Sequence, residues 1–321
     1  MRSITSLMNK KNIKIFLEFV EIQTKIASFF PMMVGFLWTS YYFKEFNWLN
    51  SIVFFLAATI FDMTVTAINN TLDYHKAIDS EYKEEENVIG KYKLNYRTMV
   101  IIVFVLLAIS LALSLTLVWL TDPMLLFIGA ALYFIGIIYT FGPLPISRTP
   151  YGEIFSSLTM GFGITFLAVF MTRYEVVLSS EWTMTYLSLN IGWLDILTIL
   201  WFSLPQILLT ANIMLANNTR DLDTDIQNNR WTLVYYIGRP NAIKLYQLLS
   251  ILPWIVWLTY IITGVLPWWA ILTLGVGYFH YQSVKRYTER VPQPIAFKEA
   301  IQSFVLFLSM YVCVLIILQF I

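Results

Sequence analysis

The sequence predicts an all-α, polytopic membrane protein, and three observations lead to that fold class. First, 58% of the 321 residues are hydrophobic and only 13% are charged, whereas about 25% is usual in soluble domains. Second, apolar runs of about 18 or more residues recur along the chain, which is enough to cross a bilayer as a helix. Third, these runs are continuously apolar and do not alternate as barrel strands do. Because backbone polar groups in a bilayer need partners within the protein, we expect helices.

Nine apolar runs define the expected transmembrane helices. They cover residues 24–42, 48–70, 97–119, 123–141, 154–172, 193–216, 244–262, 266–282 and 300–320. Trp and Tyr are frequent near the ends of the runs, as expected for side chains that favour the membrane–water interface. We expect a single transmembrane domain, residues 1–321, with two related halves of about 1–150 and 151–321, because one polar motif occurs in each half.

The connections between these spans form two sets that differ sharply in Lys and Arg content. One set consists of residues 43–47, 120–122, 173–192 and 263–265, and it holds only Lys44 and Arg173 of the 21 basic residues. The other set consists of the N-terminal segment and residues 71–96, 142–153, 217–243 and 283–299. The positive-inside rule places this second set in the cytoplasm, together with the N-terminus. A net charge of +1 indicates no nucleic-acid partner.

The polar motif that occurs in both halves has the pattern Asn-Asn-Thr-x-Asp. Its first copy, Asn69 to Asp73, ends the second expected span, and its second copy, Asn217 to Asp221, ends the sixth. A further aspartate follows each copy. A charge in hydrocarbon is costly, and less so near the interface. Carboxylates at matching places in both halves therefore suggest two sides of one polar site at the cytoplasmic end of the spans.

In the second copy of the motif, the spacing of the polar residues predicts that they lie on one side of a helix. Asn217, Asp221 and Asp225 follow one another at intervals of four, so on a helix they form one stripe of oxygen atoms. Asn69 and Asp73 begin the same stripe, but Asp79 would face away from it on a regular helix. The helix must therefore end or unwind between Asp73 and Asp79, or Asp79 has another role.

Clusters of oxygen ligands with few carboxylates suit Mg²⁺, which commonly binds through one or two carboxylates and substrate phosphates. The predicted metal ligands are Asn69, Asp73, Asp79, Asn217, Asp221 and Asp225. Arg220, Arg230 and Lys76 lie nearby and could bind phosphate oxygens. An amphiphile with a diphosphate head and an apolar tail would fit such a site, with its head at the motifs and its tail between the helices.

Simpler interpretations exist for these residues. A single aspartate at a helix end can be a cap or a juxtamembrane charge, although two copies of one pattern make this weaker. The acidic run from Glu81 to Glu86 is typical of a solvated face. Asp62, inside the second span, is either functional or packed against a polar partner, and the sequence leaves both possibilities open.

Residues 69–79 resemble the first Asp-rich motif of the UbiA superfamily of intramembrane aromatic prenyltransferases, and residues 217–233 resemble the second. Residues 139–145 with 151–153 resemble a loop of one branch, the 1,4-dihydroxy-2-naphthoate polyprenyltransferases. The resemblance extends over the whole chain. Two positions depart from the family pattern, because Asn70 stands where many members have Asp and Asn229 where many have Gly. The first departure removes a carboxylate from one motif, which makes Asp79 more important.

The resemblance implies a Mg²⁺-dependent transfer of a polyprenyl group from a polyprenyl diphosphate to an aromatic acceptor, dihydroxynaphthoate, in a bacterial cell membrane. The four motif aspartates Asp73, Asp79, Asp221 and Asp225 would be catalytic. The expected substrate-binding residues are Asn69, Asn70, Asn217, Arg220, Arg230, Lys76, Lys25, Tyr139 and Arg148. Arg148 could hold the acceptor carboxylate, or it could be one of the cytoplasmic positive charges.

Two other functions compete with this one. The same chemistry could use another acceptor, such as 4-hydroxybenzoate or haem, because acceptor choice depends on the shape of the pocket. A cation-coupled transporter also places paired acidic sites in repeated halves, usually inverted and at the membrane midplane. Here an even number of spans separates the two motifs, so they have the same orientation, and they lie at the ends of the spans. Both facts favour the enzyme.

Overall fold

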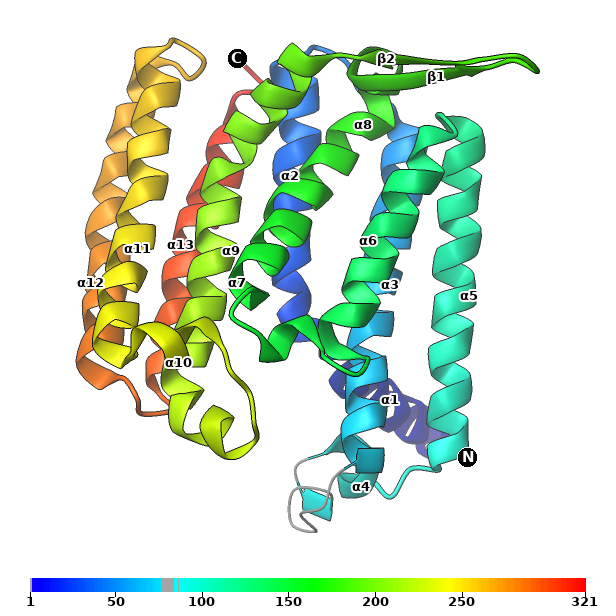
Figure 1. The fold of residues 1–321 in the computed structure, drawn as a ribbon, viewed down its shortest axis with the longest axis vertical. Coiled ribbons are helices and arrows are strands. Elements are labelled where there is room, and N and C mark those ends of the chain that lie inside the picture. The colour runs from blue at the N-terminus through cyan, green and yellow to red at the C-terminus, as the bar shows by residue number, and fades with distance from the viewer. Residues whose placement is uncertain (1, 77–83, 86) are drawn as a thin grey trace. The chain divides into compact units, whose positions relative to one another are not determined.

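The computed structural model describes residues 2–76, 84–85 and 87–321, and most of these residues lie in helices (Figure 1). Their contacts divide the chain into two compact units. Unit 1 contains Met1–Ile26 and Ile52–Leu120, and unit 2 contains Ala27–Ser51 and Thr121–Ile321. The arrangement of two related halves within a single domain stays a prediction.

Unit 1 is built around two long helices. Its elements are α1 (Arg2–Phe19), a 3₁₀ turn (Ile22–Lys25), α3 (Trp48–Lys76), α4 (Val88–Lys91) and α5 (Tyr96–Leu120). The first residues of α3 belong to unit 2. Helices α3 and α5 are joined by a hydrogen bond that the Ser110 hydroxyl donates to the carbonyl of Ala57, 3.1 Å away. A small core of buried apolar residues, among them Phe19, Ala67 and Ile89, connects α1 and α4 to α3.

Unit 2 contains the remaining elements, arranged around α9. They are α2 (Ile26–Tyr41), α6 (Met124–Thr140), a 3₁₀ turn (Ile146–Arg148), α7 (Gly152–Ser156), a π-helical segment (Ser157–Gly163), α8 (Ile164–Val177), β1 (Leu178–Trp182), β2 (Leu187–Ile191), α9 (Trp193–Gln227), α10 (Leu233–Ile237), α11 (Arg239–Ile262), a 3₁₀ segment (Trp268–Thr273), α12 (Leu274–Arg290) and α13 (Ala296–Ile317). Helix α9 packs against α7, α8, α10, α11 and α13. It is the longest helix among the described residues.

Six helices of the described chain are long and apolar enough to cross a membrane. They are Trp48–His75, Tyr96–Leu120, Gly152–Val177, Trp193–Gln227, Arg239–Ile262 and Ala296–Ile317, and α6 is a shorter apolar helix. The prediction of a helical membrane protein is therefore confirmed. The count of nine spans is not. Each of the nine predicted runs overlaps a helix, but α2 and α12 have only 16 and 17 residues.

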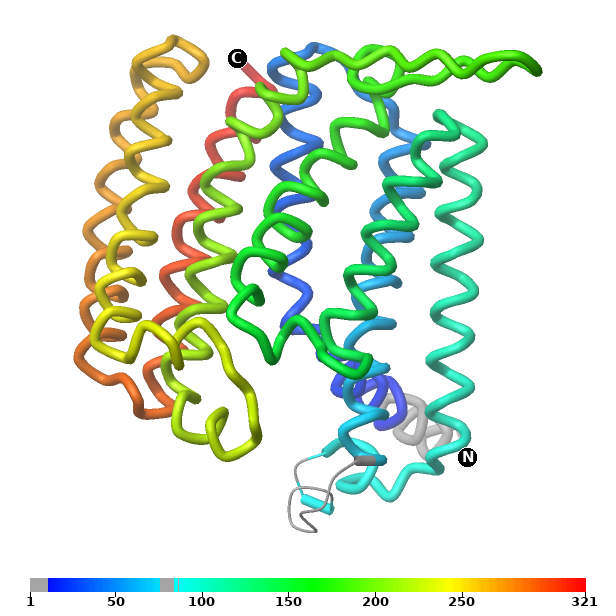
Figure 2. The backbone as a smooth tube through the Cα atoms, viewed as in Figure 1, coloured from blue at the N-terminus to red at the C-terminus, as the bar shows by residue number. Residues whose placement is uncertain are grey.

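Glycine allows two close approaches between helices in unit 2. A Cβ atom on Gly161 would lie 2.7 Å from the backbone of Ile207 in α9, and one on Gly35 of α2 would lie 2.6 Å from the Cβ of Ala168 in α8. Small residues commonly permit such contacts between membrane helices. The segment from α7 through the π-helical turns to α8 forms one continuous path alongside α9 (Figure 2).

An aromatic core compensates for a proline inside α9. Pro205 cannot donate to the carbonyl four residues earlier, which belongs to Trp201, and the hydroxyl of Tyr260 donates to this carbonyl at 2.7 Å. Next to it, Trp38 stacks on Phe202 with ring centroids 3.7 Å apart. The indole of Trp38 donates to the hydroxyl of Tyr311 at 2.6 Å. The same four helices, α2, α9, α11 and α13, thus share both apolar contacts and hydrogen bonds.

The contact at Gly161 makes a testable prediction about stability. Gly161→Ala places a methyl group against the backbone of Ile207, which cannot move away as a flexible side chain would. We expect a loss of about 1–3 kcal/mol, measured as a lower thermal unfolding temperature in detergent. Gly129→Ala in α6 is the matched control, because no described atom lies within 4 Å of the added methyl. Equal unfolding temperatures for the two variants would contradict the close packing of the π-helical segment on α9.

Candidate active site

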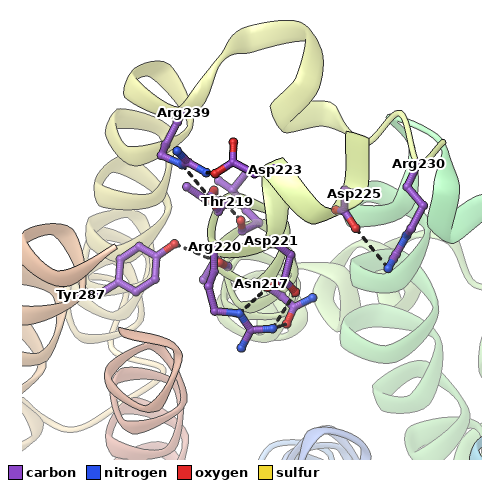
Figure 3. A network of polar contacts seen from close by, with 11 residues as sticks. Asn217, Thr219, Arg220, Asp221, Asp223, Asp225, Arg230, Arg239 and Tyr287 are labelled. Atoms are coloured by element: carbon purple, nitrogen blue, oxygen red, sulfur yellow. Dashed lines mark hydrogen bonds and ion pairs between the residues drawn. The ribbon is translucent and has the colours of Figure 1, made fainter. Parts of the chain in front are cut away.

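The second polar motif lies on the last turns of α9, which stays helical as far as Gln227. Asn217, Asp221 and Asp225 therefore lie along one side of a single helix, at intervals of four residues. Side chains from neighbouring segments, those of Glu153, Arg230 and Arg239, bind polar residues on these turns. Figure 3 shows this network around the end of α9.

Arg220 is itself part of the second motif and binds two other residues of it. Its guanidinium donates to both carboxylate oxygens of Asp221, at 2.6 Å each, and to the amide oxygen of Asn217 at 2.9 Å. The group also lies over the ring of Phe297 in α13, 4.7 Å from its centroid. Two parallel bonds to one carboxylate are the strong, directional arrangement that arginine provides. Arg220 thus places a positive charge directly beside the oxygens that were predicted to bind metal.

Asp225 is buried at the end of the stripe, with 3% of its surface exposed. Arg230 forms an ion pair with its Oδ1 at 3.2 Å (Figure 3), and the backbone N–H of Arg230 donates to the carbonyl of Asp225. The other carboxylate oxygen, Oδ2, is buried and has no hydrogen-bond partner among the described residues. A buried carboxylate oxygen without a partner is costly, so a ligand at this position would be stabilised.

The loop between α6 and α7 is attached to this region. The carbonyl of Arg148 accepts a hydrogen bond from the N–H of Trp231 at 2.9 Å, and the carbonyl of Ser147 accepts one from Arg230 at 3.4 Å. Tyr139, at the end of α6, donates to the carbonyl of Gly152 at 3.5 Å. The structure therefore brings the loop that carries Arg148 against the loop that follows the second motif, while the side chain of Arg148 stays exposed.

Glu153 is a site residue that the sequence reasoning missed. It begins α7, only 4% of its surface is exposed, and its Oε1 accepts a hydrogen bond from Asn218 at 2.9 Å. Its Oε2 is buried without a hydrogen-bond partner within the described part of the chain. A usable signal was present, because a carboxylate at the start of an apolar run needs a polar partner. Because Glu153 and Asn218 are 65 positions apart in the chain, the sequence did not indicate that they pair.

Two further contacts connect the motif to its surroundings. Arg239, at the start of α11, donates to Asp223 at 2.9 Å and to the carbonyl of Thr219 at 3.2 Å. Tyr287 of α12 donates to the carbonyl of Ala216 at 3.0 Å. Neither contact involves the stripe of oxygens formed by Asn217, Asp221 and Asp225 (Figure 3). They hold the end of α9 in position without occupying Asp221 or Asp225.

The first motif lies in unit 1, on the last turns of α3 as far as Lys76. The Asn70 amide donates to the carbonyl of Phe19 at 2.9 Å and to the carboxylate of Glu21 at 3.3 Å, so it joins α3 to the end of α1. Asp73 is exposed, and Oδ1 of Asn69 is buried with no hydrogen-bond partner in the described residues. Asp79 lies outside the described residues, and the metal-binding role of this motif stays a prediction.

Lys25 has its ammonium inside unit 1. It donates to Oδ1 of Asp62 at 2.8 Å, to the carbonyl of Asp62 at 3.1 Å and to the hydroxyl of Thr66. The lysine side chain is 8% exposed and the aspartate side chain 21%. Of the two possibilities for Asp62, the structure therefore shows the packed one. The expected role of Lys25 in binding phosphate stays a prediction, and it would need one of these bonds to open.

The donor set of the second motif fits Mg²⁺. It consists of the amide oxygen of Asn217 and the carboxylate oxygens of Asp221 and Asp225 on one helical stripe, and Oδ2 of Asp225 is buried and unpartnered among the described residues. All are hard oxygen ligands, as this ion prefers. Within residues 2–76, 84–85 and 87–321, however, no group of three or more His, Cys, Asp or Glu side chains is placed to hold a metal. A complete site would therefore need oxygens from other sources, such as substrate phosphates.

The chain belongs to the UbiA prenyltransferase family, whose sequence profile matches residues 28–311. This confirms the prediction that the protein is a prenyltransferase. Among similar proteins is the 1,4-dihydroxy-2-naphthoate octaprenyltransferase of Bacillus subtilis (strain 168), 25% identical over 255 residues, which are 79% of this chain and 76% of the relative. The protein of the same name from Mycobacterium leprae (strain TN) is 26% identical over 210 residues, 64% of this chain and 65% of the relative.

Solved structures share the fold. The apo structure of a UbiA homolog from Aeropyrum pernix K1 superposes with a TM-score of 0.65 at 15% identity, covering 94% of this chain and 99% of that one. A UbiA homolog from Archaeoglobus fulgidus bound to DMAPP and Mg²⁺ superposes with a TM-score of 0.58 at 14% identity, with the same coverage. At these identities, the likeness establishes the UbiA-like helical fold alone.

The bond between Glu153 and Asn218 yields a prediction about the rigidity of the site. Glu153→Ala leaves the buried amide of Asn218 without its acceptor, which costs about 1–3 kcal/mol. Glu153→Gln keeps an oxygen in the same place and should retain most of that stability. Thermal unfolding of the two purified variants measures the difference. Equal stability of the alanine variant and the wild type would show that the bond does not form.

The pair of Lys25 and Asp62 makes a second prediction. Lys25→Met leaves a largely buried carboxylate without its positive partner, and we expect a loss of about 3–5 kcal/mol. The double variant Lys25→Met with Asp62→Leu should recover most of this loss, because no charge is then buried alone. Unfolding of the two single variants and the double variant forms a double-mutant cycle. A coupling energy near zero would contradict a stabilising ion pair between Lys25 and Asp62.

Proposed function

We propose that this protein transfers a polyprenyl group from a polyprenyl diphosphate to 1,4-dihydroxy-2-naphthoate, with Mg²⁺ as its cofactor and with loss of the acceptor carboxylate. The product would be demethylmenaquinol. The single observation that carries the acceptor is that the curated relatives from Bacillus subtilis and Mycobacterium leprae are both named 1,4-dihydroxy-2-naphthoate octaprenyltransferases. For the diphosphate and the metal, support comes from family structures bound to DMAPP or GPP together with Mg²⁺.

The second motif would bind the diphosphate head. Asp221 and Asp225 would hold Mg²⁺, which neutralises the charge that develops on the departing diphosphate. Arg220 would turn from Asp221 towards a phosphate, since a guanidinium can bind phosphate in the same bidentate way as it binds carboxylate. Arg230 would keep its position beside Asp225 and donate from its remaining N–H groups. The first motif, with Asn69, Asp73 and Asp79, would supply the second set of oxygens.

The loop between α6 and α7 would bind the aromatic acceptor. It is attached to the segment after the second motif through the contact of Arg148 with Trp231. The exposed guanidinium of Arg148 suits a carboxylate such as that of dihydroxynaphthoate. Tyr139 would lie beside the ring, at the end of α6. Glu153 would keep this loop in register with the motif through its bond to Asn218.

In the reaction itself, the bond between the allylic carbon and the diphosphate oxygen breaks, and the diphosphate leaves with the electron pair. The electron-rich ring then forms a carbon–carbon bond to the allylic cation, and the acceptor carboxylate leaves as carbon dioxide. The apolar side chains of the spans would surround the prenyl tail and exclude water, which would otherwise trap the cation. We further propose that both motifs face the cytoplasm of a bacterial cell, because the basic residues gather in the same connections.

A product assay tests this function. Purified protein in lipid is supplied with Mg²⁺, an all-trans polyprenyl diphosphate and 1,4-dihydroxy-2-naphthoate, and the products are followed by mass. We expect a prenylated, decarboxylated naphthoquinol that disappears when the metal is chelated. Product formation with 4-hydroxybenzoate but not with the naphthoate would keep the family reaction and overturn the acceptor. Haem is tested as an acceptor in the same way.

Substitution of the motif aspartates gives the sharpest prediction about the site. Asp73→Asn and Asp221→Asn each remove a charge needed to hold the metal, and we expect activity to fall by about 100-fold or more. Asp223→Asn is the matched control, because this carboxylate lies on the same helix but is 72% exposed and pairs with Arg239. The control should keep near-normal activity. If Asp221→Asn were as active as Asp223→Asn, the proposed metal site would be wrong.

A further inference from the structure

A short β-hairpin joins α8 to α9, at the end of α9 that is farther from the second motif. Strand β1 follows directly after α8, and β2 ends two residues before α9 begins. The helical segment Gly152–Val177, which ends with α8, and helix α9 are each long and apolar enough to cross a membrane. The hairpin must therefore lie at a membrane surface, where these two spans end. It projects crosswise from the helices that it joins (Figure 2).

The register of the two strands gives the hairpin two chemically different faces. Cross-strand partners share a face, and the faces alternate along each strand. One face carries the pairs Leu178 with Ile191, Ser180 with Leu189, and Trp182 with Leu187. The other carries Ser179 with Asn190 and Glu181 with Ser188. Five of the six side chains on the first face are apolar, and all four on the second are polar.

The apolar face is open. Trp182, Leu187, Leu189 and Ile191 are each about half exposed, with fractions from 46% to 53%. At the tip, Met184 is fully exposed and Tyr186 is 60% exposed. A continuous apolar face of this kind loses free energy if it stays in water. Trp182 on this face and Tyr186 at the tip are residue types that favour the boundary between lipid headgroups and acyl chains.

Contacts with α6 show which way the apolar face is turned. Ser180 lies on this face, and its hydroxyl donates to Asp122, just before α6, at 2.7 Å. Trp182 lies on the same face and stacks on Phe127 in the first turn of α6, with centroids 6.2 Å apart and planes 4° from parallel. The apolar face of the hairpin is therefore directed along α6, towards the transmembrane helices.

The polar face is attached to the end of α8 only at the base of the hairpin. There, the hydroxyl of Ser179 and the amide of Asn190 both donate to the carbonyl of Glu175, at 3.1 and 3.4 Å. Beyond this base, Glu181 and Ser188 are exposed. The hairpin is therefore held at its base and amphipathic along its length.

We propose that this hairpin is an interfacial membrane anchor. Its apolar face rests on the lipid of the adjacent leaflet, and its polar face is in contact with water. Lipid is the occupant that fits, because the two flanking spans already hold the hairpin at the bilayer surface and its apolar face is turned towards the bilayer. The inference goes beyond the proposed function and does not depend on it.

Spin labels on adjacent residues test this directly. The single cysteine, Cys313, is replaced by alanine, and a nitroxide is attached to Leu189→Cys or to Asn190→Cys in full-length protein in lipid nanodiscs. These neighbours lie on opposite faces of β2, and both are exposed. Collisions with oxygen, which concentrates in lipid, are compared with collisions with a water-soluble nickel chelate. We expect the ratio of oxygen to nickel collisions to be several-fold higher at position 189 than at position 190.

Three other results would overturn the proposal. Equal ratios at both positions, dominated by the nickel chelate, would place the whole hairpin in water. A label at position 189 that is shielded from both reagents would mean that protein, such as a second copy of the chain, covers the face. A ratio that is higher at position 190 than at position 189 would mean that the polar face, and not the apolar face, is turned towards the lipid. The pair Leu187→Cys and Ser188→Cys repeats the comparison, so that poor folding of one variant does not remove the test.

Discussion

Buried polar groups need hydrogen-bond or ion-pair partners, and this requirement determines contacts both in the aromatic core and around the second motif. Pro205 deprives the carbonyl of Trp201 of its usual helical partner, and the hydroxyl of Tyr260 takes that place from α11. An unpaired carbonyl in an apolar interior costs several kcal/mol. A neighbouring helix thus supplies the hydrogen-bond donor that the proline in α9 lacks. Trp38 and Tyr311 extend the same arrangement to α2 and α13, so that apolar packing and hydrogen bonding stabilise the same four helices.

The same requirement shapes the second motif. Arg220 pairs with Asp221, Arg230 pairs with Asp225, and Glu153 accepts from Asn218. Each of these three polar side chains of α9 therefore has a partner of opposite charge or a hydrogen-bond acceptor. Two carboxylate oxygens of this network, Oδ2 of Asp225 and Oε2 of Glu153, are buried with no hydrogen-bond partner among the described residues. The one on Asp225 belongs to the predicted metal ligands. In the proposed metal-binding role, this oxygen would accept the cation, while the paired charges would keep the motif in place when the cation leaves.

Much of the fold could be predicted from the sequence, because long apolar runs have one solution in a bilayer. The nine predicted runs all overlap helices, and the regular spacing from Asn217 to Asp225 places these residues on one stripe of α9. The partners of the polar residues could not be predicted. Lys25 and Asp62 are 37 positions apart, and Glu153 and Asn218 are 65 apart. The two strands in the connection 173–192 were not predicted, because each is only five residues long.

The sequence by itself determined the membrane-embedded helical class, the family and the two copies of the polar motif, since these depend on composition and on residues close together in the chain. Only the tertiary structure decided how the polar groups are paired. It assigned Asp62 to Lys25, gave Asn70 the task of joining α3 to α1, and added Glu153 to the second motif. It also gave the connection between α8 and α9 its two faces. The physical reason is that local pattern specifies which side chains need a partner, whereas the packing of distant segments determines which partner is within reach.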